Sequence, residues 1–129
     1  MSSALEGIDA VIFDLDGVVT RTAKVHAQAW KAAFDPIPFD PVADYLRYVD
    51  GKPRLEGVRS FLAARGIAAS EEEVRALGER KNARFLDLLK GGVEVFQSSV
   101  DLIRALCRDG VRTAVVTASR NCEAVLRAA

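Results

Sequence analysis

A short apolar run that leads directly into an acidic turn places the strongest constraint on the fold of this chain. Residues 8–13, IDAVIF, are apolar apart from Asp9, and the sequence then continues as DLDG at residues 14–17. A continuous apolar run of this length is typical of a strand that is buried on both faces. Strands of that kind occur in parallel sheets covered by helices, so the run indicates an α/β fold.

A second apolar run, VRTAVVT at residues 111–117, predicts another buried strand. Strands of an α/β fold that are joined through helices pair in parallel. We therefore expect a core formed by residues 1–20 and 93–129, with a helical segment inserted between its strands at residues 21–92. Parallel sheets place their sites at the carboxyl ends of the strands, where Asp14 and Thr117 lie.

Helical spacing and capping signals predict several helices within the insert. Ser70 and Glu73 form a capping box before a long amphipathic segment that ends at a glycine pair. Residues 35–41 contain three of the four prolines and predict a loop. We expect helices at residues 22–34, 42–49, 54–64 and 71–90, a further one from Ser98 or Ser99 to Asp109, and a last one from about Asn121.

The composition excludes several classes of partner. The 129 residues include 18 Lys and Arg and 18 Asp and Glu, so no basic surface for nucleic acid is expected. No apolar run approaches the roughly 20 residues that span a bilayer, and the N-terminus lacks the pattern of a signal peptide. We expect a cytoplasmic protein without a membrane or nucleic-acid partner, as a monomer or weak oligomer.

The acidic pair can support phosphoryl-transfer chemistry. In extended backbone, residues two apart point the same way, so Asp14 and Asp16 project together. Two adjacent carboxylates repel each other unless a cation or hydrogen bonds compensate, and Mg²⁺ prefers such hard oxygen ligands beside a phosphate. One carboxylate can then act as nucleophile and the other as proton donor. The alternative is a polar turn in which both acids are solvated.

Four segments together resemble a known family. Residues 14–30 are similar to the first motif and cap entry of β-phosphoglucomutases in the haloacid dehalogenase superfamily. The resemblance extends to GKPR at residues 51–54, RKN at 80–82 and VVTASRN at 115–121. It implies a Rossmann-like core with a parallel sheet, into which an α-helical cap domain is inserted.

The resemblance also implies roles for single residues. Asp14 would take the phosphoryl group and bind Mg²⁺, and Asp16 would act as acid and base while its backbone carbonyl also reaches the metal. Thr117 and the amide of Ala118 would bind the transferring phosphate, although Thr117 could instead cap a helix. Arg54 would hold a second phosphate through its guanidinium. The other substrate-binding positions that the resemblance implies are Thr22, His26, Gly51, Lys81, Ser119 and Asn121.

Some features depart from the family pattern. Arg21 stands where this branch commonly has an acidic residue, and the connection at residues 34–39 is shorter than in close relatives. The family's later lysine and acidic pair have no counterpart before Ala129. We therefore expect a fragment of a protein of about 220–260 residues, judged by typical domain sizes.

Three functions remain open. The first is a Mg²⁺-dependent mutase that interconverts β-glucose 1-phosphate and glucose 6-phosphate. The second is a phosphatase of the same fold that acts on a small phosphorylated sugar. The third is an inactive, truncated phosphate-binding module.

Overall fold

The computed structural model describes residues 5–129, so the first four residues of the expected core segment 1–20 lie outside it. No helix within residues 5–129 is both long and apolar enough to cross a bilayer. The elements follow the order β1 (Ala10–Asp14), α1 (Ala23–Phe34), the π-helix η2 (Tyr45–Val49), α2 (Arg54–Ala64), α3 (Glu71–Leu89), α4 (Gln97–Arg108), β2 (Arg112–Val116) and α5 (Cys122–Ala128).

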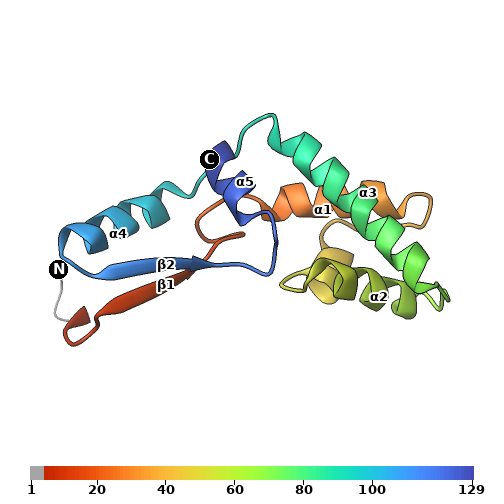
Figure 1. Cartoon of the computed structure of the whole chain (residues 1–129), viewed down its shortest axis with the longest axis horizontal. Helices are drawn as coiled ribbons and strands as arrows, with labels where there is room; N and C mark the ends of the chain where they lie inside the picture. Colours follow the sequence, from red (N-terminus) through yellow and green to blue (C-terminus); the bar gives the residue numbers. More distant parts are fainter. Residues whose placement is uncertain (1–4) are drawn as a thin grey trace.

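The two strands pair in parallel, as the sequence predicts, although four α-helices and the π-helix η2 separate them along the chain. Ala10 lies opposite Arg112, and Asp14 lies opposite Val116. The carboxyl ends of both strands therefore meet at one edge, next to the helical insert (Figure 1). This arrangement confirms the α/β fold class and brings the segments after β1 and β2 together.

The expectation that both strands are buried on both faces is wrong for this chain. Phe13 and Val115 pack in one hydrophobic cluster with Leu106 of α4, which runs along one side of the strand pair (Figure 1). On the other face, Ile12 is 68% exposed and Val116 is 52% exposed. Apolar runs show that a strand is suited to burial on two faces, but they do not show whether another element covers each face.

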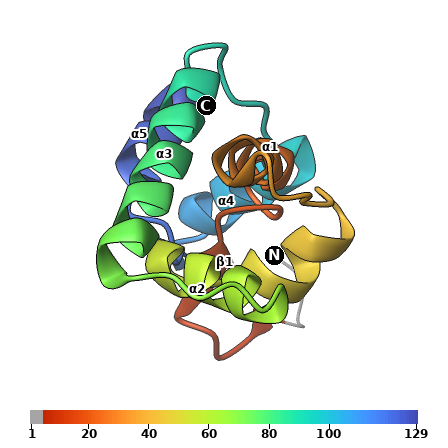
Figure 2. The same ribbon diagram turned by 90° about the vertical axis from the view of Figure 1, so that its right-hand side faces the viewer.

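The helical insert has a core of its own, which we call the insert cluster. Phe61 of α2 lies at its centre, with its ring 4.2 Å from that of Phe34 and 5.1 Å from that of Phe39. Figure 2 shows α1, α2 and α3 around this core. The insert cluster comprises Ala27, Trp30, Phe34, Phe39, Tyr45, Val49, Val58, Phe61, Leu62 and Val74.

Helix boundaries agree with the sequence for α1, α2 and α3 and differ for η2 and α4. The Ser70 hydroxyl accepts a hydrogen bond from the Glu73 amide and begins α3 as predicted. The expected α-helix at residues 42–49 is instead the short π-helix η2. The helix expected from Ser98 or Ser99 begins at Gln97, because the Ser99 hydroxyl donates to the Val18 carbonyl at 2.6 Å rather than capping the helix.

The two connections between strands and insert lie side by side. The Arg21 amide donates to the Glu94 carbonyl at 2.8 Å, and the Phe96 amide donates to the Val19 carbonyl at 2.9 Å. The Arg21 guanidinium also lies 4.1 Å from the centre of the Phe96 ring, within the range of a cation–π contact. The insert therefore leaves and rejoins the strand pair through one paired hinge.

We predict that Phe61→Ala destabilises the chain by about 3–5 kcal/mol, because it removes a fully buried ring from the insert cluster. Urea unfolding measures the change. Leu46→Ala is the matched control, since Leu46 is 65% exposed on η2 and its truncation should cost less than about 0.5 kcal/mol. Similar losses in both variants would contradict this account of the core.

Candidate active site

A cleft of about 450 Å³ lies between the strand ends and the insert. Asp14 and Asp16 reach it from the end of β1, and residues 117–121 reach it from the loop after β2. The opposite wall comes from α1, η2, α2 and α3. This volume falls within the range of small-molecule sites, and its walls combine both parts of the chain.

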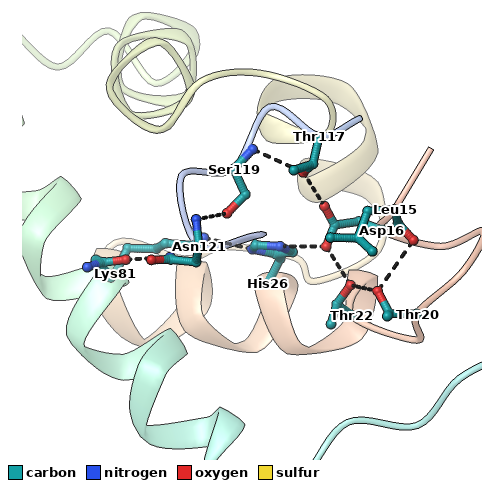
Figure 3. Close-up of polar contacts among 10 residues, drawn as sticks. Leu15, Asp16, Thr20, Thr22, His26, Lys81, Thr117, Ser119 and Asn121 are labelled. Carbon is teal, nitrogen blue, oxygen red and sulfur yellow. Dashed lines mark hydrogen bonds and ion pairs between the residues drawn. The ribbon is translucent and has the colours of Figure 1, made fainter. Parts of the chain in front are cut away.

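Asp16 is the most extensively hydrogen-bonded carboxylate of the cleft (Figure 3). Thr22 donates to its Oδ1, and Thr117 donates to its Oδ2 at 2.8 Å. His26 Nε2 lies 3.0 Å from Oδ1. Burial raises the pKa of Asp16, but the hydrogen bonds from His26 and Thr22, the charge of His26 and the bond from Thr117 outweigh it and lower the pKa to about 2. Asp16 is therefore ionised at neutral pH.

Asp14 lines the same cleft, but the surroundings of its carboxylate differ from those of Asp16. Its side chain is exposed, and within residues 5–129 its carboxylate makes no hydrogen bond or ion pair. The expected projection of both acids into one site agrees with this position. One carboxylate is held rigidly and the other remains available for an incoming group.

His26 and Lys81 extend the network of Asp16 across the cleft wall. Lys81 Nζ lies 2.8 Å from His26 Nδ1, so the ammonium donates to Nδ1 while Nε2–H donates to Asp16. The His26 ring stacks on Phe85 at 4.1 Å. Burial and the Lys81 charge lower the pKa of His26, against the opposing effect of Asp16, which is consistent with this neutral tautomer.

Lys81 is a buried cation. It is 5% exposed, and its ammonium lies 5.2 Å from the Trp30 ring centre and 4.6 Å from that of Phe85. Burial and, to a smaller extent, the nearby charge of Arg54 lower its pKa to about 7, while Asp16 acts in the opposite direction. A lysine with a pKa this low is typical of functional sites.

The loop after β2 forms a chain of hydrogen bonds that ends on the insert. The Thr117 hydroxyl accepts from the Ser119 amide at 3.1 Å, and the Ser119 hydroxyl accepts from the Asn121 amide at 3.1 Å. The Asn121 side chain donates to Asn82 Oδ1 of α3 at 2.7 Å. This contact joins the two walls of the cleft, and only the RKN triplet in the sequence pointed to Asn82.

Most of the predicted site residues line the cleft, but Thr22 does not. Thr22 is fully buried and contacts Thr20 and Asp16 rather than the open space. In this structure Thr22 holds Asp16, and its direct contact with substrate stays a prediction. The predicted residues that line the cleft are Asp14, Asp16, His26, Gly51, Arg54, Lys81, Thr117, Ala118, Ser119 and Asn121.

The acidic pair fits a magnesium ion only in part. Within residues 5–129 no group of three or more His, Cys, Asp and Glu side chains could hold a metal. However, Mg²⁺ is usually held by one or two protein carboxylates, with substrate phosphate and water as its other ligands. The unpartnered carboxylate of Asp14 has the donor chemistry for that arrangement.

We predict that Thr22→Val raises the pKa of Asp16 from about 2 toward its ordinary 3.8, because the ionised form loses a donor. Since the folded-state pKa lies below the ordinary value, ionised Asp16 stabilises the fold above about pH 4, and this contribution disappears as the pH falls toward 2. NMR titration of the Asp16 carboxyl carbon measures the shift. In Ser99→Ala, which removes a hydroxyl bonded to Val18, the pKa should not move. An unchanged pKa in Thr22→Val would overturn the assignment.

We predict that Lys81→Met raises the free energy of unfolding, most strongly below pH 7. Between about pH 10.5 and about pH 7 the unfolded chain binds the Lys81 proton and the folded chain does not, so wild-type stability falls as the pH falls through this window. Urea unfolding at pH 6 and pH 9 should show a larger gain at pH 6. Lys31→Met, on the exposed side of α1, serves as control. A destabilised Lys81→Met variant at pH 6 would be inconsistent with this account.

Comparison with known proteins identifies relatives of this architecture. The chain is 42% identical to β-phosphoglucomutase of Mycobacterium tuberculosis in an alignment that is 144 positions long with its gaps and covers 94% of this chain and 55% of that protein. It matches the crystal structure of β-phosphoglucomutase from Clostridium difficile with a TM-score of 0.80 and 27% identity, over 94% of this chain and 56% of that one. The chain thus spans about half the length of the curated relatives it matches.

A third relative was solved with a ligand. CbbY from Rhodobacter sphaeroides, in complex with xylulose-(1,5)bisphosphate, matches with a TM-score of 0.78 and 26% identity, over 94% of this chain and 56% of that one. The family model for haloacid dehalogenase-like hydrolases matches residues 8–129. Members of that family typically depend on Mg²⁺. The chain belongs to the haloacid dehalogenase-like hydrolase family and is β-phosphoglucomutase-like.

Proposed function

We propose that the complete gene product transfers a phosphoryl group through Asp14, as a sugar-phosphate mutase that interconverts β-glucose 1-phosphate and glucose 6-phosphate. The contrast between the two acids carries this proposal. Asp16 is ionised and held by donors from both walls of the cleft, whereas Asp14 is exposed in the same cleft without a partner. A fixed base beside a free nucleophile suits group transfer between two sugar oxygens.

The ionised state of Asp16 suits the half-reaction that begins from phosphorylated Asp14. Asp16 accepts the proton of a sugar hydroxyl, whose oxygen attacks phosphorus while the bond from phosphorus to the Asp14 oxygen breaks. The products are a sugar bisphosphate, a free Asp14 carboxylate and a protonated Asp16. In the second half-reaction Asp14 attacks the other phosphate, and Asp16 returns its proton to the departing sugar oxygen.

Mg²⁺ would be held by the Asp14 carboxylate and the Asp16 backbone carbonyl, where it would supply positive charge beside the phosphoryl oxygens. Thr117 and the Ala118 amide line the cleft beside Asp16. The amide would donate to the transferring phosphate, and the Thr117 hydroxyl would do so once its one proton turns from Asp16 to that phosphate.

Residues 21–92 would act as a mobile cap that encloses the sugar phosphate. Exclusion of water directs the phosphoryl group to sugar rather than to hydrolysis. Arg54 lines the cleft with its guanidinium free of ion pairs among residues 5–129, so it is available for the second phosphate. We assign that phosphate to Arg54 together with Ser119 and Asn121, and cap closure to His26, Gly51 and Lys81.

The second candidate is a phosphatase that acts on a small sugar phosphate. Arg21 favours it, because its contact with Phe96 stiffens the hinge through which a cap would close. A cap that closes poorly admits water to the aspartyl phosphate, and hydrolysis then competes with transfer to sugar.

The reaction products distinguish the mutase from the phosphatase and from an inactive module. The complete gene product is incubated with β-glucose 1-phosphate, Mg²⁺ and a trace of the glucose bisphosphate, and glucose 6-phosphate and inorganic phosphate are followed together. Glucose 6-phosphate without phosphate release supports the mutase. Phosphate release alone supports the phosphatase. If neither product forms, the remaining possibility is a phosphate-binding module without turnover.

We predict that Asp14→Asn lowers turnover by several orders of magnitude, as loss of a covalent nucleophile does. Steady-state rates on β-glucose 1-phosphate measure the effect. Asp9→Asn is the matched control, because Asp9 is an exposed acid immediately before β1 and lies outside the cleft. Substantial activity in Asp14→Asn would exclude the proposed mechanism.

A further inference from the structure

One hydrogen bond joins α3 of the insert directly to the loop after β2. The side-chain nitrogen of Asn121 donates to Asn82 Oδ1 at 2.7 Å, between residues that are 39 positions apart in the chain. Both residues are half-buried, and neither carboxamide makes another hydrogen bond within residues 5–129. Asn121 lines the cleft, whereas Asn82 does not. The contact of Asn82 with the cleft therefore runs through Asn121.

The position of Asn82 on α3 follows from that of Lys81. Lys81 Nζ contacts His26 of α1, and the next residue of a helix lies about 100° further around its axis. The helix thus turns Lys81 toward α1 and Asn82 toward the loop after β2. One turn of α3 therefore contacts both the hydrogen-bond network of Asp16 and the side chain of Asn121.

The bond to Asn82 determines which end of the Asn121 carboxamide faces α3. A carboxamide has an oxygen that accepts hydrogen bonds and a nitrogen with two N–H groups that donate them. Because Asn82 presents an acceptor, the nitrogen end is fixed toward α3, and one of its two N–H groups is used. The second N–H of the same nitrogen remains for a ligand. A phosphate accepts hydrogen bonds and repels a carbonyl oxygen, so the opposite orientation of Asn121 would bind it less well.

The backbone of Asn121 is held by the loop itself. Its amide donates to the Ser119 hydroxyl, and the Ser119 amide donates to the Thr117 hydroxyl, each at 3.1 Å (Figure 3). These bonds fix the position of Asn121, but they leave its side chain free to rotate. Asn82 supplies the contact that the loop lacks, and it does so from the opposite wall of the cleft.

We propose that Asn82 is a positioning residue that orients the Asn121 carboxamide toward the second phosphate of the substrate. This inference rests on the proposed function, in which Arg54, Ser119 and Asn121 bind that phosphate. Without Asn82 the side chain would rotate freely, and binding would have to offset the entropy of fixing it. A side chain that is held in its binding orientation before the ligand arrives avoids this cost.

A double-mutant cycle in the complete gene product with Mg²⁺ tests this role. β-Glucose 1-phosphate binds the phosphorylated enzyme with its phosphate in the second position, whereas acetyl phosphate carries only the group that is transferred. We expect Asn82→Leu to raise KM for β-glucose 1-phosphate about fivefold, with kcat changed less than about twofold, and to leave kcat/KM for acetyl phosphate unchanged. In an Asn121→Ala background, Asn82→Leu should add less than about a twofold loss, because the two residues act as a unit.

Gln97→Leu is the control for the loss of a carboxamide. Gln97 donates to Asp101 at 2.8 Å on α4, outside the cleft, so its variant should keep the wild-type KM. Asn82→Leu should unfold within about 0.5 M urea of wild type, and Asn82→Ala repeats the kinetic measurement without an added apolar side chain.

Two results would overturn the positioning role. One is an unchanged KM for β-glucose 1-phosphate in both Asn82 variants, and the other is a full additional loss from Asn82→Leu in the Asn121→Ala background. If wild-type protein instead forms neither glucose 6-phosphate nor inorganic phosphate, or Asp14→Asn retains activity, the proposed function itself fails.

Discussion

The carboxylate of Asp16 accepts hydrogen bonds from two segments that are far apart in sequence. Thr22 lies at the start of the insert, His26 lies on α1, and Thr117 follows β2. These donors reach one carboxylate only if β1 and β2 hold their parallel register and α1 leaves the strand end at its observed angle. A partly buried charge is costly without such donors, so the same bonds that prepare Asp16 for chemistry also favour the arrangement of strand pair and insert.

The hydrogen-bond network continues from Asp16 through His26 to Lys81, whose buried positive charge lowers the stability of the fold. A buried ammonium beside two aromatic rings has a pKa lowered to about 7, so the fold carries a cation that an apolar side chain would replace at lower free energy. Buried ionisable residues of this kind are common at functional sites. The buried charge on α3 therefore lowers the stability of the fold at the cleft wall, whereas the aromatic core around Phe61 raises it within the insert.

The sequence predicted those features that local patterns determine. Apolar runs marked both strands, and Ser70 marked the start of α3 because a cap acts within one turn. The position of the acidic pair at a strand end followed from the parallel arrangement. Exposure of Ile12 depends on what covers the sheet, the buried position of Thr22 depends on tertiary contacts, and the π-helix η2 stands where the spacing predicted an α-helix. None of these three has a periodic signal, so each became visible only in three dimensions.

In the proposed mechanism, the unpartnered carboxylate of Asp14 carries the phosphoryl group. Trapping the phosphorylated enzyme tests it most directly. The complete gene product is mixed with β-glucose 1-phosphate and Mg²⁺, quenched, reduced with borohydride to convert any aspartyl phosphate to homoserine, and sequenced by mass spectrometry. The account predicts homoserine at Asp14 with Asp16 unmodified. Modification at Asp16, or a fully unmodified segment from an active enzyme, would contradict it.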